Sequence, residues 1–116
     1  MVGIVIATHG NLAEGLVDSL ELIMGKQKKY ATIGLFHGDS VENFAEELQK
    51  KVSNVDDGSG VIILTDLFSA TPYNQAAHLI NKEQGKNRKI QLISGVNLPM
   101  LIQAFNCQLL NESLEK

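Results

Sequence analysis

The stretch that most constrains this chain is residues 2–10, an apolar and largely β-branched run that stops at His9 and Gly10. Such a run is typical of a strand buried on both faces of a parallel sheet. A helical pattern begins directly after it, over about residues 11–24. A strand followed so closely by a helix is the first half of a βαβ unit, and such folds bind ligands at the carboxyl ends of their strands. His9 therefore lies where a functional residue is expected.

The same alternation of strand and helix occurs four times along the chain. Further strands are expected at about residues 30–36, 61–65 and 90–95. A second helix is expected from about residue 41 to the loop at 54–60, and a third from residue 72 to near Gly85. A fourth has a helical apolar face that ends at Leu109. Residues 111–116 lose the apolar pattern and are expected to fray. This alternation predicts one α/β domain over residues 1–116, with an open parallel four-stranded sheet and helices on both faces. The strand order that we expect for this sheet is 2-1-3-4.

Finer features of the helices can also be predicted. The first helix should bury a stripe at three-to-four spacing made of Leu12, Leu16, Leu20 and Ile23 or Met24. The helix starts should be capped by Asn11, by an Asp39 and Glu42 capping box, by Thr71 with Pro72 at the first helical position, and by Asn97.

Charge and cysteine content narrow the functional classes. The formal net charge is -3, which gives no electrostatic case for binding nucleic acid or an anionic membrane, since both usually require a basic surface. No secretory leader pattern and no apolar run of about 20 residues is present in the sequence. The single cysteine, Cys107, cannot form an internal disulfide and is expected to be a buried thiol. These features favour a cytoplasmic protein that does not bind nucleic acid.

The predicted topology brings polar residues to one rim of the sheet. In a parallel sheet the carboxyl ends of the strands meet, and the order 2-1-3-4 makes the strands that end at His9 and Asp66 neighbours. A carboxylate can accept the N–H of one ring nitrogen and leave the other as an outward lone pair. The helix start at Thr71 offers free N–H groups to an anion such as phosphate. Two interpretations follow: a phosphohistidine used in phosphoryl transfer, or a strand-end histidine hydrogen-bonded for structure.

Other site chemistries are weakly supported. His9, His37 and His78 lack the paired spacing of zinc ligands, so no metal is expected, and neither a P-loop nor a G-x-S-x-G elbow occurs. A phosphohistidine hydrolase would carry an arginine beside its histidine, whereas Thr8 stands there and the only arginine is the distant Arg88. Hydrolysis is therefore disfavoured.

Three blocks of residues resemble a known family. They are residues 3–16, residues 64–68 with 71–74, and residues 95–101. Together they resemble the IIA component of the mannose family of the bacterial phosphoenolpyruvate-dependent sugar phosphotransferase system, in order and spacing, over nearly the whole chain. Two departures are visible: Ser69 and Ala70 replace a glycine pair usual in the family, and family members tend to continue into a further helix and a strand that pairs across a dimer.

The resemblance implies a role for each site residue. His9 would accept phosphate at Nε2, Asp66 would orient its imidazole, and Thr71 and the backbone near Ala70 would bind the phosphate, with Asn97 at the rim. It also implies a phosphotransferase without a cofactor, which takes phosphate from HPr and passes it to a IIB component that serves a membrane sugar permease complex. A homodimer is a further implied partner state. A regulatory phosphohistidine module and the phosphotransfer subunit of a dihydroxyacetone kinase system remain alternatives.

Overall fold

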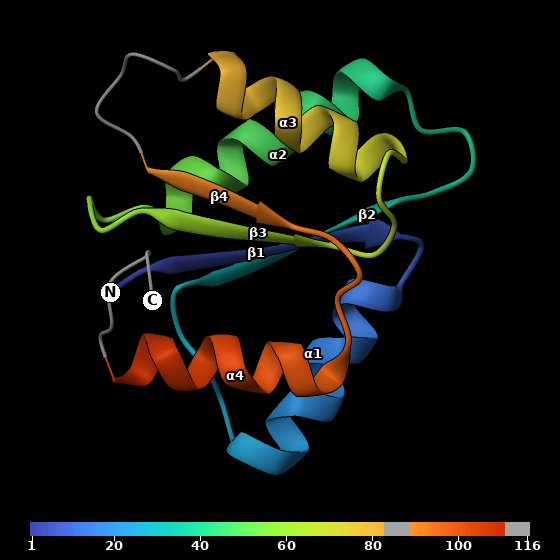
Figure 1. Cartoon of the computed structure of the whole chain (residues 1–116). Helices are drawn as coiled ribbons and strands as arrows, with labels where there is room; N and C mark the ends of the chain where they lie inside the picture. The colour runs from blue at the N-terminus through green and yellow to red at the C-terminus, as the bar shows by residue number, and fades with distance from the viewer. Residues whose placement is uncertain (83–88, 111–116) are drawn as a thin grey trace.

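A computed structural model describes residues 1–82 and 89–110 of the chain. Four parallel strands form one sheet of order β2-β1-β3-β4, and four helices alternate with them along the chain (Figure 1). The elements are β1 (Gly3–His9), α1 (Leu12–Met24), β2 (Tyr30–Leu35), α2 (Val41–Val55), β3 (Val61–Thr65), α3 (Thr71–Lys82), β4 (Ile90–Ile93) and α4 (Leu98–Leu109). The predicted fold class, strand order and placement of helices on both faces are confirmed. No helix in the described part of the chain is long and apolar enough to span a membrane.

The strand register fixes which residues meet at the carboxyl-terminal edge of the sheet. In β1, Ala7 pairs with Thr65 of β3, and His9 pairs with Leu35 of β2. Asp66 follows Thr65 directly, so it emerges from the sheet beside the end of β1. The central position of β1 therefore places His9 between two neighbouring strand ends.

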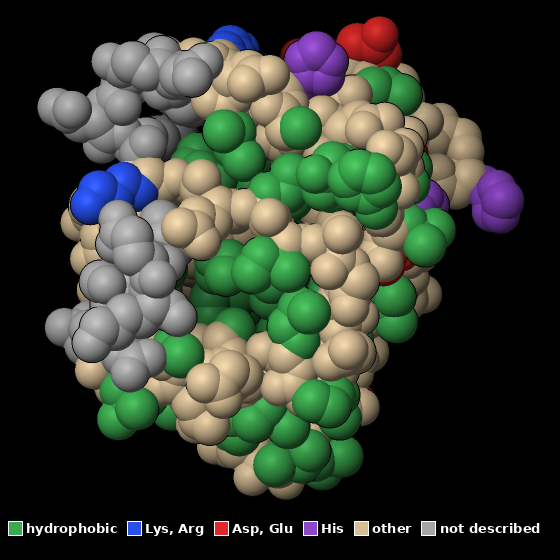
Figure 2. Space-filling model, in the orientation of Figure 1, with side chains coloured by type: hydrophobic (Ala, Val, Ile, Leu, Met, Phe, Trp, Pro, Cys, Tyr) green, Lys and Arg blue, Asp and Glu red, His purple; other side chains and the backbone are tan. Residues whose placement is uncertain are grey.

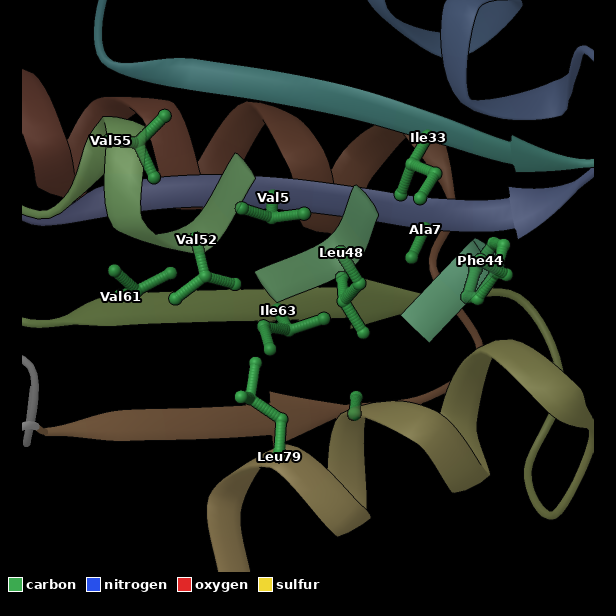
Figure 3. Packing of buried hydrophobic residues seen from close by; sticks show 11 residues of the cluster. Val5, Ala7, Ile33, Phe44, Leu48, Val52, Val55, Val61, Ile63 and Leu79 are labelled. Atoms are coloured by element: carbon green, nitrogen blue, oxygen red, sulfur yellow. The ribbon is translucent and has the colours of Figure 1, made fainter. Parts of the chain in front are cut away.

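Two apolar layers hold the sheet between the helices. On one face, side chains of β1 and β3 pack against α2 and α3, with Val5, Ile63, Leu48 and Val52 fully buried (Figure 3). On the other face, Ile4, Ile6 and Leu64 pack against α1 and α4. Both faces of β1 are therefore covered, as its continuous apolar run predicts.

The buried stripe of α1 agrees with the prediction only in part. Leu20 is buried, and Leu16 and Met24 are half-buried and pack against the core. Leu12 and Ile23 are exposed, and Ala13 and Val17 are buried instead. Both sets have three-to-four spacing, so periodicity alone could not choose between them. Small Ala13 lies against the sheet because the preceding strand anchors its backbone N–H.

Two of the predicted helix caps are wrong, and a third is confirmed in position but makes no side-chain bond. Asn11 occupies the cap of α1 without a side-chain bond, and Ser40 caps α2 because its Oγ accepts from Asn43 N at 3.0 Å. The carboxylate of Asp39 instead accepts from Phe36 N within the preceding turn. Thr71 is the first residue of α3, and the carbonyl of Ala70 accepts the first helical bond, so Ala70 holds the cap position. The Asn97 cap is confirmed, with Met100 N as donor at 2.9 Å.

Some predicted boundaries and burial states also change. Helix α2 continues to Val55, which is buried, and β4 ends at Ile93 rather than Gly95. In α4, Gln108 is buried together with Leu101 and Phe105, whereas Leu109 is exposed. Cys107 is half-buried rather than buried. The predicted helix end near Gly85 and the fraying of residues 111–116 lie outside the described residues.

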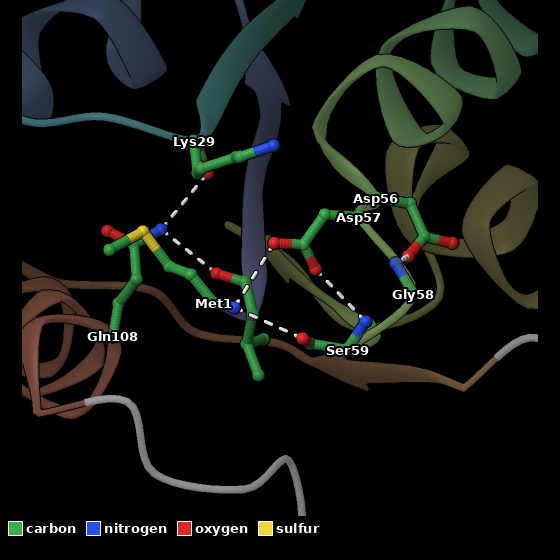
Figure 4. Close-up of polar contacts among 8 residues, drawn as sticks. Met1, Lys29, Asp56, Asp57, Gly58, Ser59 and Gln108 are labelled. Atoms are coloured by element: carbon green, nitrogen blue, oxygen red, sulfur yellow. Dashed lines mark hydrogen bonds and ion pairs between the residues drawn. The ribbon is translucent and has the colours of Figure 1, made fainter.

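The buried Gln108 joins segments at the amino-terminal edge of the sheet (Figure 4). Its Nε2 donates to the carbonyls of Val2 and Lys29, at 2.9 and 3.1 Å, just before β1 and β2. Nearby, the Met1 ammonium donates to Asp57 Oδ2 and Ser59 Oγ, both at 3.1 Å. These bonds tie α4, β1, β2 and the loop before β3 together at the end opposite His9.

Gly34 in β2 has a steric reason to be glycine. A Cβ at this position would lie 2.2 Å from the carbonyl oxygen of Gly10, which no L side chain tolerates. Gly10 itself has a φ of +57° and donates its N–H to Leu35 O at 2.8 Å. The turn after His9 therefore lies directly against β2.

Replacing Gly34 by alanine should destabilise the fold by about 1–3 kcal/mol, because the Gly10 turn must move to make room. The matched control is Gly15→Ala in α1, where a Cβ would meet nothing within 4 Å. That variant should gain up to about 1 kcal/mol from helix propensity. Urea unfolding of both variants would measure the difference, and equal stabilities would contradict the proposed close contact.

Candidate functional site

His9 and Asp66 form a close pair at the carboxyl-terminal edge of the sheet. Nδ1 of His9 lies 2.9 Å from Oδ2 of Asp66, and the backbone N–H of His9 donates to the same oxygen at 3.1 Å. Oδ1 of Asp66 accepts from Leu67 N at 3.0 Å. One carboxylate oxygen thus binds both the ring and the backbone of His9, which restricts how the imidazole can rotate.

The two side chains differ in exposure. The His9 side chain is 43% exposed, and that of Asp66 is 12% exposed. Burial by itself would raise the pKa of Asp66, but hydrogen bonds from the ring and backbone of His9 and the charge of His9 together lower it. Asp66 is therefore ionised at neutral pH and can only accept hydrogen bonds, so Nδ1 must carry the proton. The lone pair of Nε2 is then left on the more exposed part of the ring.

Each of the three residues at the end of β1 is bonded to a different neighbour. Thr8 is fully buried, and its Oγ1 accepts from Ala13 N of α1 at 2.9 Å. His9 N donates to Asp66 after β3, and Gly10 N donates to Leu35 O of β2. The backbone on both sides of the imidazole is therefore held by α1, β2 and the loop after β3.

The other predicted site residues occupy the same edge with different roles. Thr71 is half-buried and is the first residue of α3. The loop that joins β3 to α3 separates it from Asp66. Ala70 precedes it and supplies the carbonyl for the first turn of the helix. Asn97 uses its side-chain oxygen to cap α4, which ties it to that helix start. The structure thus joins His9 to Asp66 by direct bonds and places Thr71, Ala70 and Asn97 on neighbouring segments of the rim.

The loop between β3 and α3 has an unusual backbone. Ser69 has a φ of +64°, a region that favours glycine and costs other residues about 1 kcal/mol or more. The side chain of Asn74 donates to Ser69 O at 3.0 Å and holds this conformation. This backbone angle suits the glycine that the resembled family usually has at position 69. In this chain the bond from Asn74 to the Ser69 carbonyl stabilises the same angle at a serine.

Exposed apolar side chains lie on the segments that follow the carboxyl ends of β1, β2 and β3. Phe36 follows β2, Leu67 and Phe68 follow Asp66, and Leu12 begins α1; their exposed fractions are 48, 59, 68 and 46%. The Phe68 ring packs edge-on against Tyr73 with centroids 4.8 Å apart, so it is held in place although exposed. Figure 2 shows hydrophobic side chains among others on the right-hand side of the molecule, the side toward which the strands run in Figure 1. We call these four residues the apolar collar.

Sequence reasoning missed two features of this site. The sequence shows only that Thr8 stands where a phosphohistidine hydrolase would have arginine. Neither the burial of Thr8 nor the bond from Ala13 N to its hydroxyl can be predicted from the neighbouring residues. The apolar collar was also missed, although Leu67 and Phe68 after a strand-end aspartate are a visible signal of an apolar surface. Within residues 1–82 and 89–110, no group of three or more histidine, cysteine or acidic side chains could hold a metal ion.

Comparison with known proteins gives a consistent result. A family model described as "PTS system fructose IIA component" matches residues 3–116. The PTS system mannose-specific EIIAB component of Escherichia coli K12 is 32% identical over 103 residues, which are 88% of this chain and 30% of that protein. The PTS system fructose-specific EIIA component of Bacillus subtilis is 27% identical over 106 residues, which are 91% of this chain and 70% of that protein. The chain therefore spans less than a third of the E. coli relative.

A solved structure agrees with these sequence matches. The crystal structure of phosphotransferase system component EIIA from Streptococcus agalactiae superposes with a TM-score of 0.89 and is 34% identical. The superposition covers 99% of this chain and 85% of that one. The family resemblance drawn from the three sequence blocks is confirmed.

The lowered pKa of Asp66 predicts an acid-dependent loss of stability. The ionised carboxylate stabilises the fold above its ordinary pKa of 3.8, and this contribution is lost as pH falls through the lowered folded-state value. In Asp66→Asn the free energy of unfolding should therefore fall less between about pH 5 and pH 3 than in the wild type. Urea unfolding across this range would measure it, with Glu46→Gln on the exposed face of α2 as the control that should keep the wild-type slope.

Proposed function

The chain belongs to the family of PTS fructose IIA components, which includes mannose-specific relatives, and we propose that it is a phosphoryl carrier that holds phosphate on His9 during sugar uptake. In this proposal residues 1–116 form one phosphocarrier domain that takes phosphate from HPr and passes it to a IIB component serving a membrane sugar permease. The proposed partners place this work in the cytoplasm.

The observation that carries the proposal is the sharing of Asp66 Oδ2 between the ring and the backbone of His9. With Nδ1 acting as donor, Nε2 presents a lone pair in a fixed direction toward solvent. Attack by Nε2 forms a nitrogen–phosphorus bond as the bond to the donor's histidine nitrogen breaks, while the Nδ1 proton stays in place. The positive charge that develops on the imidazole then lies beside the Asp66 carboxylate, which stabilises it.

The start of α3 provides the proposed phosphate contacts. Helices α1 and α2 each have a glutamate in the first turn, whereas α3 has no acidic residue there. The free N–H groups and dipole of α3 are therefore not offset by a carboxylate of its own first turn and suit a phosphoryl group. Thr71 adds a hydroxyl at the first residue of this helix.

The apolar collar supports a protein partner for this site. Its four exposed side chains would be covered by a partner docked over His9. Glu14, Asp39 and Glu42 lie at the same edge, because each follows the carboxyl end of a strand by a few residues. Several lysines lie toward the opposite edge, because they precede strands or end helices: Lys26, Lys28, Lys29, Lys82 and Lys89. A partner that is apolar at its centre and positively charged around it would fit, and HPr and the IIB component are proposed to dock here in turn.

The proposal predicts that phosphoenolpyruvate, enzyme I and HPr together add one acid-labile phosphate to the chain. His9→Ala should abolish this addition, because it removes the nitrogen that bonds to phosphorus. Asp66→Asn should keep the fold but lower the transfer rate by about tenfold or more, because the ring loses its orienting carboxylate. Intact-mass measurement at neutral and acid pH would read both results.

Unchanged labelling of His9→Ala, or no labelling of folded wild-type protein, would contradict the phosphocarrier function. Onward transfer to a IIB component separates the transport role from a regulatory module, in which the phosphate would stay on His9.

Phe68→Ala should slow transfer from phospho-HPr through weaker docking, because it removes the most exposed ring of the collar. Phosphorylation by phosphoramidate, a small donor that needs no docking, should remain within about twofold of the wild type. Leu22→Ala is the matched control, since Leu22 is 85% exposed in the last turn of α1, far along the chain from the collar. A loss of similar size with both donors would place Phe68 in the chemistry rather than in docking.

We also propose that the outer edge of β4 pairs with a second copy of the chain. Strand β4 lies at one end of the sheet, and residues 90–93 carry no charge that would discourage pairing. At the other end, the Nζ of Lys51 donates to Thr32 O of β2 and occupies that edge. A monomeric mass in solution at all protein concentrations would contradict this homodimer.

A further inference from the structure

We propose that Thr8 is a positioning residue for His9, and that its hydroxyl sets the direction in which the imidazole presents Nε2. This inference rests on the proposed phosphocarrier function and adds a residue that touches neither the imidazole nor the phosphoryl group. Its basis is the single buried bond between Thr8 Oγ1 and Ala13 N at 2.9 Å.

The Thr8 bond closes a short loop around His9. Only Gly10, Asn11 and Leu12 separate His9 from Ala13, and Gly10 has a positive φ. Asn11, at the cap position of α1, makes no side-chain bond to the helix. The Thr8 hydroxyl, which belongs to the strand, therefore accepts the N–H bond that a capping side chain would accept. It holds the first turn of α1 to the residue directly before His9.

The bond also sets the geometry of the Asp66 contact. His9 makes two bonds to one carboxylate oxygen, one from the imidazole and one from its backbone N–H. That N–H belongs to the peptide unit between Thr8 and His9. If Thr8 loses its anchor to α1, this peptide can rotate, and the backbone and ring can no longer both reach Asp66 Oδ2 as they do now. A shift of about 1 Å in a reacting group can cost up to about a hundredfold in rate.

The neighbouring strand supplies a matched control. Thr65 precedes Asp66 in β3 as Thr8 precedes His9 in β1, and both threonines are fully buried. Among the described residues, however, the Thr65 hydroxyl has no hydrogen-bond partner. Replacing either residue by valine changes one buried hydroxyl to a methyl group of similar size, but only the change at Thr8 removes a bond.

The test compares Thr8→Val, Thr8→Ser and Thr65→Val in the full chain. We expect Thr8→Val to take phosphate from phosphoramidate about tenfold more slowly than the wild type. Thr8→Ser, which keeps the hydroxyl, and Thr65→Val should stay within about twofold. The nitrogen-15 shifts of the His9 ring report which ring nitrogen holds the proton, and only Thr8→Val should lose the preference for Nδ1–H. Faster amide exchange at Ala13 in this variant would confirm that the intended bond is broken.

A wild-type rate and an unchanged ring spectrum in folded Thr8→Val would overturn the proposal, as would an equal loss in Thr65→Val. If Thr8→Val does not fold, Thr8→Cys takes its place, because a thiol is only a weak acceptor. If the wild type takes no phosphate from any donor, the phosphocarrier function fails, but the ring spectrum and the Ala13 exchange still decide whether Thr8 positions His9.

Discussion

The site depends on one carboxylate oxygen that accepts two hydrogen bonds from the same residue. Oδ2 of Asp66 binds both the backbone N–H and Nδ1 of His9, so the ring is oriented relative to its own main chain. A lone bond to the ring would leave the backbone free to turn, and a lone bond to the backbone would leave the ring free. The lowered pKa of Asp66 follows from these bonds, which outweigh the cost of burying the charge.

The fold around this pair holds it from several directions. The register of β1 with β3 brings Asp66 beside His9, the absent side chain of Gly34 admits the turn at Gly10, and the Thr8 hydroxyl joins the strand end to α1. At the opposite edge, Gln108 and the Met1 ammonium tie the starts of the strands together. These contacts hold the backbone and Nδ1 of His9.

The His9–Asp66 pair and the apolar collar lie toward the same edge of the sheet, where the strands end. Glu14 and Glu42 also follow strand ends, and the lysines that follow helices or precede strands are toward the other edge. This distribution is a consequence of the βα arrangement, since every loop that follows a strand emerges at one edge.

Local patterns in the sequence determined the fold class, the order 2-1-3-4, and the meeting of His9 with Asp66. These depend on apolar runs, helical spacing and right-handed crossovers, each of which acts over short stretches of chain. Only the tertiary structure decided that Ala13 rather than Leu12 faces the sheet, that Gln108 is buried, and that Ala70 and Ser40 hold cap positions. It likewise decided the contact between Gly34 and Gly10 and the bond from Ala13 to Thr8. The physical reason is that apolar residues at three-to-four spacing can occur on more than one face of the same helix, so spacing alone does not show which face is buried. Burial and hydrogen bonding depend on distances between segments that are far apart in the sequence and meet only in the packed chain.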